Sequence, residues 1–167
     1  MILDKYFARP VIWDFCIATV LTIFLFYAFK NDWIILPNVT DTYSLTGDLT
    51  NITLTLAGFV LTILTVLITF KDNSSSRAEN VEYSAFGRFF ASEFYYVTVK
   101  HLKNCIKEVI IIASIGFFIK LFVPENYRSF FFFYNAFGVI ITIFTVWRCL
   151  AILSKILVLQ SNNTIDD

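Results

Sequence analysis

The chain has few of the residues that build metal centres, haem sites or catalytic triads. It contains one histidine, His101, and three cysteines that show no Cys-x-x-Cys spacing. A single histidine excludes bis-histidine haem ligation and leaves no Ser/His/Asp set for nucleophilic catalysis. An odd number of cysteines without regular spacing does not form a disulfide framework. We therefore expect no cofactor, no metal site and no enzymatic activity.

An excess of charge of one sign is also missing. Thirteen Lys and Arg residues balance thirteen Asp and Glu residues, so the formal net charge at pH 7 is zero. Without a basic excess, we expect no direct binding to nucleic acid. Hydrophobic residues, in contrast, make up 57% of the 167 residues, well above the roughly 45–50% that is usual in soluble domains. This composition predicts a protein that lies in a lipid bilayer.

Long apolar runs predict an all-α integral membrane protein in which residues 1–167 form a single domain. A helix rises ~1.5 Å per residue, so about 20 apolar residues cross a hydrocarbon core of ~30 Å. We expect residues 31–47 to form an outer loop and residues 71–104 to form a cytoplasmic loop. The four predicted transmembrane helices cover about residues 11–29, 49–70, 105–123 and 130–148.

The predicted cytoplasmic loop carries an aromatic stripe at helical spacing, which predicts an amphipathic helix at the membrane surface before the third span. Basic residues lie off this stripe and form a candidate surface for anionic lipid or for a cytosolic partner. Of these two roles, membrane anchoring is the simpler. The stripe consists of Tyr83, Phe86, Phe90, Phe94, Val97 and His101, and the basic surface of Arg88, Lys100 and Lys103.

The positions of the basic residues predict the orientation, because Lys and Arg are retained on the cytoplasmic side. Both termini and the central loop carry most of them, whereas the other side has chiefly Lys30, Lys120 and Arg128. We therefore expect a multi-pass protein of a cell inner membrane with both termini in the cytoplasm. The three cysteines, Cys16, Cys105 and Cys149, then lie near inner helix ends, where a reducing cytosol keeps them as thiols.

Small and polar residues occupy one face of the second apolar run, at an alternating spacing of three and four. Packing between helices is one interpretation, because helices in lipid associate through small residues. The other is that several copies of the chain line a water-filled path with these residues. We call this set the first seam, and it consists of Asn51, Thr55, Gly58, Thr62, Thr65 and Thr69.

A second seam follows from an internal similarity. The segment Gly58–Val66, GFVLTILTV, matches Gly138–Val146, GVIITIFTV. A duplicated helical hairpin would explain the match, and so would two runs drawn from the same few apolar residues and threonine. The second seam consists of Asn135, Gly138, Thr142, Thr145 and Cys149.

Four ionisable residues lie near the predicted inner ends of the spans: Asp14, Lys107, Glu108 and Arg148. Charges inside a membrane are costly and usually pair with one another or face water. We expect Asp14 and Arg148 to form an ion pair between the first and fourth spans. A proton-coupled site at Asp14 is the alternative, although this residue lies only about one turn into its helix.

The segment Leu54–Val66, followed by a polar linker, a Phe-rich stretch and the phrase Lys100-His-Leu-Lys-Asn-Cys-Ile-Lys, resembles small four-helix bacterial membrane proteins. Some of those proteins are similar to membrane subunits of phage-defence systems, of the Kiwa type or associated with CRISPR effectors. The resemblance implies a homo-oligomer in the inner membrane that works with a cytosolic protein. The implied function is a pore-forming or membrane-perturbing subunit of an antiviral defence system, and a scaffold or sensor that recruits the partner is the alternative.

The orientation can be tested by labelling single-cysteine variants in intact cells and in inverted vesicles. We expect a cysteine at Ser75 to react only from the cytoplasmic side and a cysteine at Thr42 only from the outside. Labelling of position 75 from outside would reverse the orientation.

Overall fold

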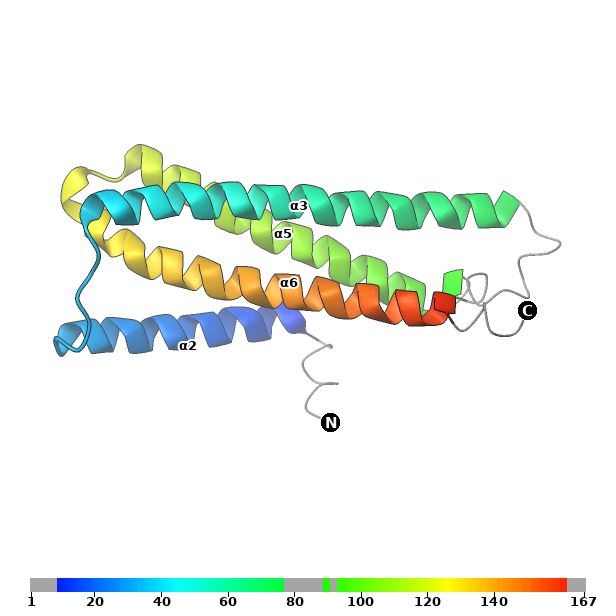
Figure 1. The fold of residues 1–167 in the computed structure, drawn as a ribbon, viewed down its shortest axis with the longest axis horizontal. Helices are drawn as coiled ribbons and strands as arrows, with labels where there is room; N and C mark the ends of the chain where they lie inside the picture. The colour runs from blue at the N-terminus through cyan, green and yellow to red at the C-terminus, as the bar shows by residue number, and fades with distance from the viewer. Residues whose placement is uncertain (1–8, 77–88, 91–92, 162–167) are drawn as a thin grey trace. The chain divides into compact units, whose positions relative to one another are not determined.

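The computed structural model describes residues 9–76, 89–90 and 93–161. Its regular elements are the α-helices α2 (Pro10–Lys30), α3 (Val39–Ser76), α5 (Glu93–Phe122) and α6 (Phe131–Ser161), and the short 3-10 helix η1 (Glu125–Phe130) (Figure 1). No strand occurs within the described ranges. The prediction of an all-α fold is confirmed for this part of the chain.

Three stretches of helix are long and apolar enough to cross a membrane: Pro10–Lys30, Val39–Asp72 and Glu125–Ser154. Their mean hydropathies lie between 2.0 and 2.3. Helices of this kind are typical of a membrane protein. The predicted span at residues 105–123 is not among these stretches, since α5 carries Lys107, Glu108 and Lys120, and it stays a prediction.

The boundaries of α2 agree with the predicted first span, because Pro10 occupies the first turn and the polar sequence after Lys30 ends the helix. The predicted outer loop is too long, since α3 already begins at Val39. Threonines in its first turns bond to their own helix, with the Thr42 hydroxyl 3.0 Å from the carbonyl oxygen of Asn38. Thr42 is also buried, so the exposed Ser44 is the better position for labelling from outside.

The predicted surface helix is part of α5, which runs from Glu93 to Phe122 without a break. Its buried side chains include Tyr95, Leu102 and Cys105. The predicted aromatic stripe does not lie in one environment, because His101 is buried whereas Val97 is 40% exposed. Tyr83, Phe86 and Arg88 lie outside the described residues.

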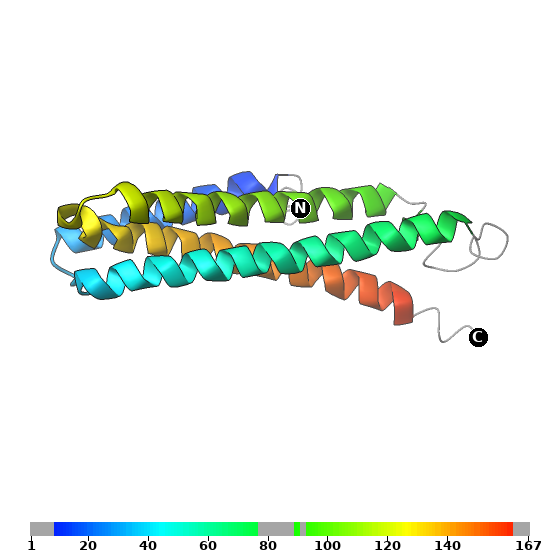
Figure 2. The ribbon, with the colours of Figure 1, turned by 90° about the horizontal axis from the view of Figure 1, so that it is seen from above.

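The chain divides into two compact units. The first consists of Met1–Leu56 and Glu108–Thr145, and the second of Ala57–Lys107 and Val146–Asp167. In the first unit α2 and parts of α3, α5 and α6 lie side by side (Figures 1 and 2). One residue from each of these helices contributes to the core, namely Ala18, Leu49, Ile112 and Ile141.

The second unit has its own core. The C-terminal half of α3 contributes the aliphatic residues Ala57, Val60, Leu64 and Leu67, which are at most 7% exposed. Phe89, Phe90 and Tyr95 form an aromatic cluster with ring centroids 5.3–5.9 Å apart. The Lys71 ammonium lies 4.6 Å from the centre of the Tyr95 ring and 4.4 Å from that of Tyr96. Cation–π contacts of this kind hold the end of α3 against α5.

Candidate functional site

The first seam lies on the exposed face of α3. All six of its residues are exposed, and a Cβ atom added to Gly58 would meet no heavy atom within 4 Å. The buried face of the same helix is made by other residues, including Val60 and Leu64. Among the described residues, the first seam therefore makes no contact between helices. If it is turned away from lipid, something other than the described residues covers it.

The hydroxyls of the first seam are satisfied within α3. The Thr62 hydroxyl donates to the carbonyl oxygen of Gly58 at 3.0 Å, and the Thr65 hydroxyl donates to that of Leu61 at 2.9 Å. Thr55 and Thr69 make the same bond to the residue four positions earlier. A hydroxyl bonded in this way costs little in an apolar environment, yet its oxygen can still accept a hydrogen bond.

The second seam is buried, in contrast to the first. Asn135 donates from its side-chain amide to the carbonyl oxygen of Thr42 at 3.0 Å. A Cβ atom at Gly138 would lie 2.6 Å from Cδ2 of Leu49 and 3.2 Å from Cγ2 of Ile112. Two matching sequence segments thus have opposite environments. The exposed fractions are 1% for Asn135, 9% for Thr142, 0% for Thr145 and 3% for Cys149, and Gly138 is also buried.

A threonine face in the N-terminal half of α3 was not predicted. Its hydroxyls donate to carbonyl oxygens within α3, for example from Thr50 to Thr46 at 2.7 Å. Gly116 leaves room for it, because a Cβ there would collide with the Thr50 hydroxyl and lie 2.9 Å from that of Tyr134. These threonines recur in the sequence at a spacing of four, four and three, but Thr42 and Thr46 lie in the segment that we predicted to be a loop. These residues are Thr42, Thr46, Thr50 and Thr53, each at most 1% exposed.

Glu108 is a buried carboxylate of the first unit. Its side chain is 1% exposed, and it accepts a hydrogen bond from the Thr145 hydroxyl at 3.1 Å. The same hydroxyl lies 2.9 Å from the carbonyl oxygen of Ile141. Thr145, a residue of the second seam, is thus hydrogen-bonded to an acidic group inside the first unit. A buried ionisable group in an apolar helix is commonly functional.

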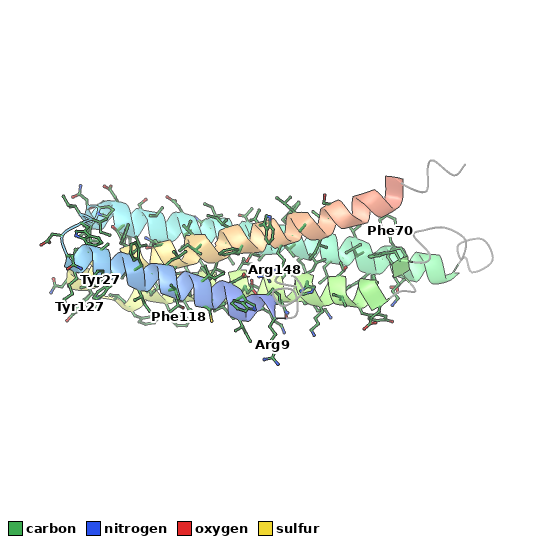
Figure 3. The ribbon with its side chains drawn as sticks, turned by 90° about the horizontal axis from the view of Figure 1, so that it is seen from below. Arg9, Tyr27, Phe70, Phe118, Tyr127 and Arg148 are labelled. Atoms are coloured by element: carbon green, nitrogen blue, oxygen red, sulfur yellow. The ribbon has the colours of Figure 1, made fainter. Side chains whose placement is uncertain are left out.

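Asp14 and Arg148, the predicted ion pair, are both completely buried. Asp14 belongs to the first unit and Arg148 to the second, so their pairing stays a prediction. Within the second unit, Nη1 of Arg148 lies 3.8 Å from Sγ of Cys105. In Figure 3 the Arg9 side chain, which directly precedes α2, projects away from the ribbon of that helix.

The predicted basic surface is described only in part. Lys100 and Lys103 are exposed on α5, whereas Arg88 lies outside the described residues. His101 lies between the two lysines in the sequence but is only 8% exposed. Burial, and to a smaller extent the charge of Lys100, lowers the pKa of His101 below its usual value of 6.5. The positive charge of this surface is therefore carried by the lysines.

No known protein family, curated protein or solved structure matches this chain. The described ranges also contain no group of three His, Cys, Asp or Glu side chains that could hold a metal ion. The function of this chain is therefore inferred from the two seams and from the buried polar groups.

The two matching glycines provide a direct test of the two environments. We expect Gly138→Leu to lower the free energy of unfolding by about 1–3 kcal/mol, because the new side chain overpacks the first unit against Leu49 and Ile112. Gly58→Leu, the matched control, should not destabilise the monomer, because its side chain enters open space. Thermal unfolding of the monomeric fraction in detergent measures both. Equal losses would contradict the opposite placement of the seams.

Proposed function

We propose that this chain is an oligomeric inner-membrane component whose copies contact one another through the first seam. The exposed position of that seam carries the proposal. Helices in lipid gain no hydrophobic energy from association, so small residues that permit close approach define their contacts. Gly58 and the neighbouring threonines offer such a surface over several turns of α3. The amide of Asn51 is exposed on the same face, and a second copy would shield it from lipid.

In the proposed topology α5 is the fourth membrane-crossing helix, and both termini lie in the cytoplasm. The charges on α5 are compatible with this placement, because Glu108 is buried in the bundle and Lys107 lies near the predicted inner end. Lys120 lies in the last turn at the other end, where a long side chain can reach the interface. The helix has 30 residues, or about 45 Å at ~1.5 Å per residue, which exceeds the hydrocarbon core.

A pore is the function that this arrangement supports best. Around a ring of copies, the seven-residue repeat of the first seam produces a left-handed crossing of neighbouring helices. Part of the face then packs against the next copy, and part can turn toward a central path. The oxygen of Thr62 can accept hydrogen bonds from water there, although its proton is used within the helix. The role in antiviral defence that we propose is what the sequence resemblance to membrane subunits of phage-defence systems implies.

A membrane scaffold or sensor is the second candidate. Lys100 and Lys103 are exposed on the N-terminal part of α5, and two lysines three positions apart lie on one side of a helix. Such a surface could recruit an acidic cytosolic partner. In that case the first seam would join copies without forming a path for ions.

Contact through the first seam can be tested by cross-linking in native membranes. In a variant without the three native cysteines, Thr65→Cys should form disulfide-linked dimers on oxidation with copper phenanthroline, because Thr65 lies two turns after Gly58 on the same side of the helix. Phe59→Cys is the matched control, because Phe59 is 57% exposed but lies about 120° around the helix from Thr65. Equal cross-linking at both positions would rule out the seam as the contact.

The pore and the scaffold differ in their effect on ion flux. For a pore, Thr62→Leu should leave the size of the oligomer unchanged and lower ion flux into liposomes, because an apolar lining promotes dewetting. Size-exclusion chromatography and a fluorescence flux assay measure the two properties. If the unmodified protein shows no flux, even with its cytosolic partner present, the scaffold is the correct interpretation.

A further inference from the structure

Two cations and a tyrosine meet at one end of the first unit. The Lys120 ammonium lies 4.2 Å from the centre of the Tyr43 ring, and the Arg128 guanidinium carbon lies 4.6 Å from the same centre. The two charges are therefore at most about 9 Å apart, since both lie close to one ring. These residues come from α3, α5 and η1, and all three lie in the parts of these elements that belong to the first unit.

The position of Lys120 depends on a glycine of α3. A Cβ atom at Gly47 would lie only 2.6 Å from the Lys120 ammonium nitrogen. The ammonium thus occupies the space that a side chain at position 47 would fill, and it is drawn toward α3 and Tyr43. Tyr43 in turn packs on Phe131, with 6.3 Å between the ring centroids. The ring that both cations contact is therefore held in place by the fold.

The positive charge at this end is only partly compensated. Arg128 forms an ion pair with Glu125 at 2.9 Å, and Glu125 is mostly exposed. Within the described ranges no carboxylate lies within ion-pair distance of Lys120, and Asp41 and Asp48 of α3 pair with neither cation. Two neighbouring cations repel each other, and this repulsion is relieved when an anion binds between them. Lys and Arg are the usual ligands of phosphate groups.

Exposed apolar side chains lie beside these cations. Leu121 follows Lys120 directly and is 74% exposed, and Phe117 is 47% exposed on the preceding turn. Phe118 and Phe122 stack on each other with ring centroids 5.8 Å apart, but they lie about 160° around α5 from Lys120 and are not part of this surface. Tyr127, which precedes Arg128, is 59% exposed and lies at the outside of this unit in Figure 3. Apolar side chains next to paired cations form the complement of an amphiphile with a negative headgroup.

We propose that Lys120 and Arg128 bind the phosphate group of an anionic phospholipid, whose acyl chains lie along the exposed apolar residues at the end of α5. Two contacts of about 2.8 Å to different oxygens of one phosphate span up to roughly 8 Å, which falls within the limit that the Tyr43 ring sets on the separation of the two cations. Tyr43 fixes the two cations, and Gly47 makes room for the ammonium. The site lies within the first unit of a single chain, so it does not depend on the contact proposed for the first seam.

Native mass spectrometry can test this site with defined lipids. The purified protein in detergent is titrated with phosphatidylglycerol and, separately, with phosphatidylcholine. We expect phosphatidylglycerol to bind more tightly, and Lys120→Gln to weaken its binding roughly tenfold through the loss of one charge-assisted hydrogen bond. Lys30→Gln is the matched control, because Lys30 is an exposed lysine predicted on the same side of the membrane. It should bind phosphatidylglycerol like the unmodified protein.

A second variant keeps both charges and separates a specific site from general attraction. Gly47→Ala places a methyl group where the ammonium lies, so Lys120 must move away while the net charge stays the same. We expect this variant to weaken phosphatidylglycerol binding severalfold and to keep the thermal stability of the unmodified protein, since only a flexible side chain shifts. Unchanged binding in both Gly47→Ala and Lys120→Gln would overturn the site. Equal losses in Lys30→Gln would do the same.

The phosphate could also come from solution, and competition distinguishes the two sources. We expect millimolar inorganic phosphate to leave phosphatidylglycerol bound, because the acyl chains contribute apolar contacts that a free ion lacks. Displacement of the lipid by inorganic phosphate at that concentration would show that the site holds a free anion, and the lipid assignment would be wrong.

Discussion

The bond from a threonine hydroxyl to the carbonyl oxygen four residues earlier determines what α3 can present to its surroundings. Thr50 makes it on the buried face and Thr62 makes it on the exposed face. In an apolar environment each polar group needs a partner, and this bond supplies one without help from any other helix. Threonine is therefore acceptable on either face of α3, and its hydroxyl does not decide which face enters the bundle.

The face of α3 that enters the bundle is determined by close packing against small residues of the neighbouring helices. Gly138 and Gly116 lie against Leu49 and Tyr134, and a Cβ atom at either glycine would collide with a neighbour. Close approach at these two points brings α3, α5 and α6 together in the first unit. Gly58 has no such neighbour, although its sequence context matches that of Gly138. The contrast leaves one glycine and threonine face of α3 open to a neighbouring molecule.

The fold could be predicted from the sequence where a single physical signal dominates. Pro10 and the polar residues after Lys30 define α2 to within a residue at each end. The beginning of α3 was missed, because threonine, aspartate and serine have low helix propensity and resemble a loop. Burial of Thr42 and Thr46 in the first unit overrides that propensity.

The candidate sites were predictable only in composition. Periodicity identified both seams. Whether a seam faces the other helices or the outside depends on the shapes of the neighbouring helices, and the sequence of one segment does not contain that information. Glu108 appeared in the sequence only as one of several inner charges. Its hydrogen bond with Thr145 joins positions 37 residues apart, and no local pattern links them. The Lys120 site has the same character, since Gly47 and Tyr43 acquire their roles only when α3 packs beside α5.

The length of α3 has a consequence for where its two ends lie. The helix has 38 residues, or about 57 Å at ~1.5 Å per residue, against a hydrocarbon thickness of ~30 Å. Its apolar part lies between Asp48 and Lys71, is about 33 Å long and matches that thickness without a large hydrophobic mismatch. In a bilayer, the first turns of α3, with their buried threonines, would therefore stand outside the hydrocarbon layer, and the first seam would meet a neighbouring copy within it in the proposed oligomer.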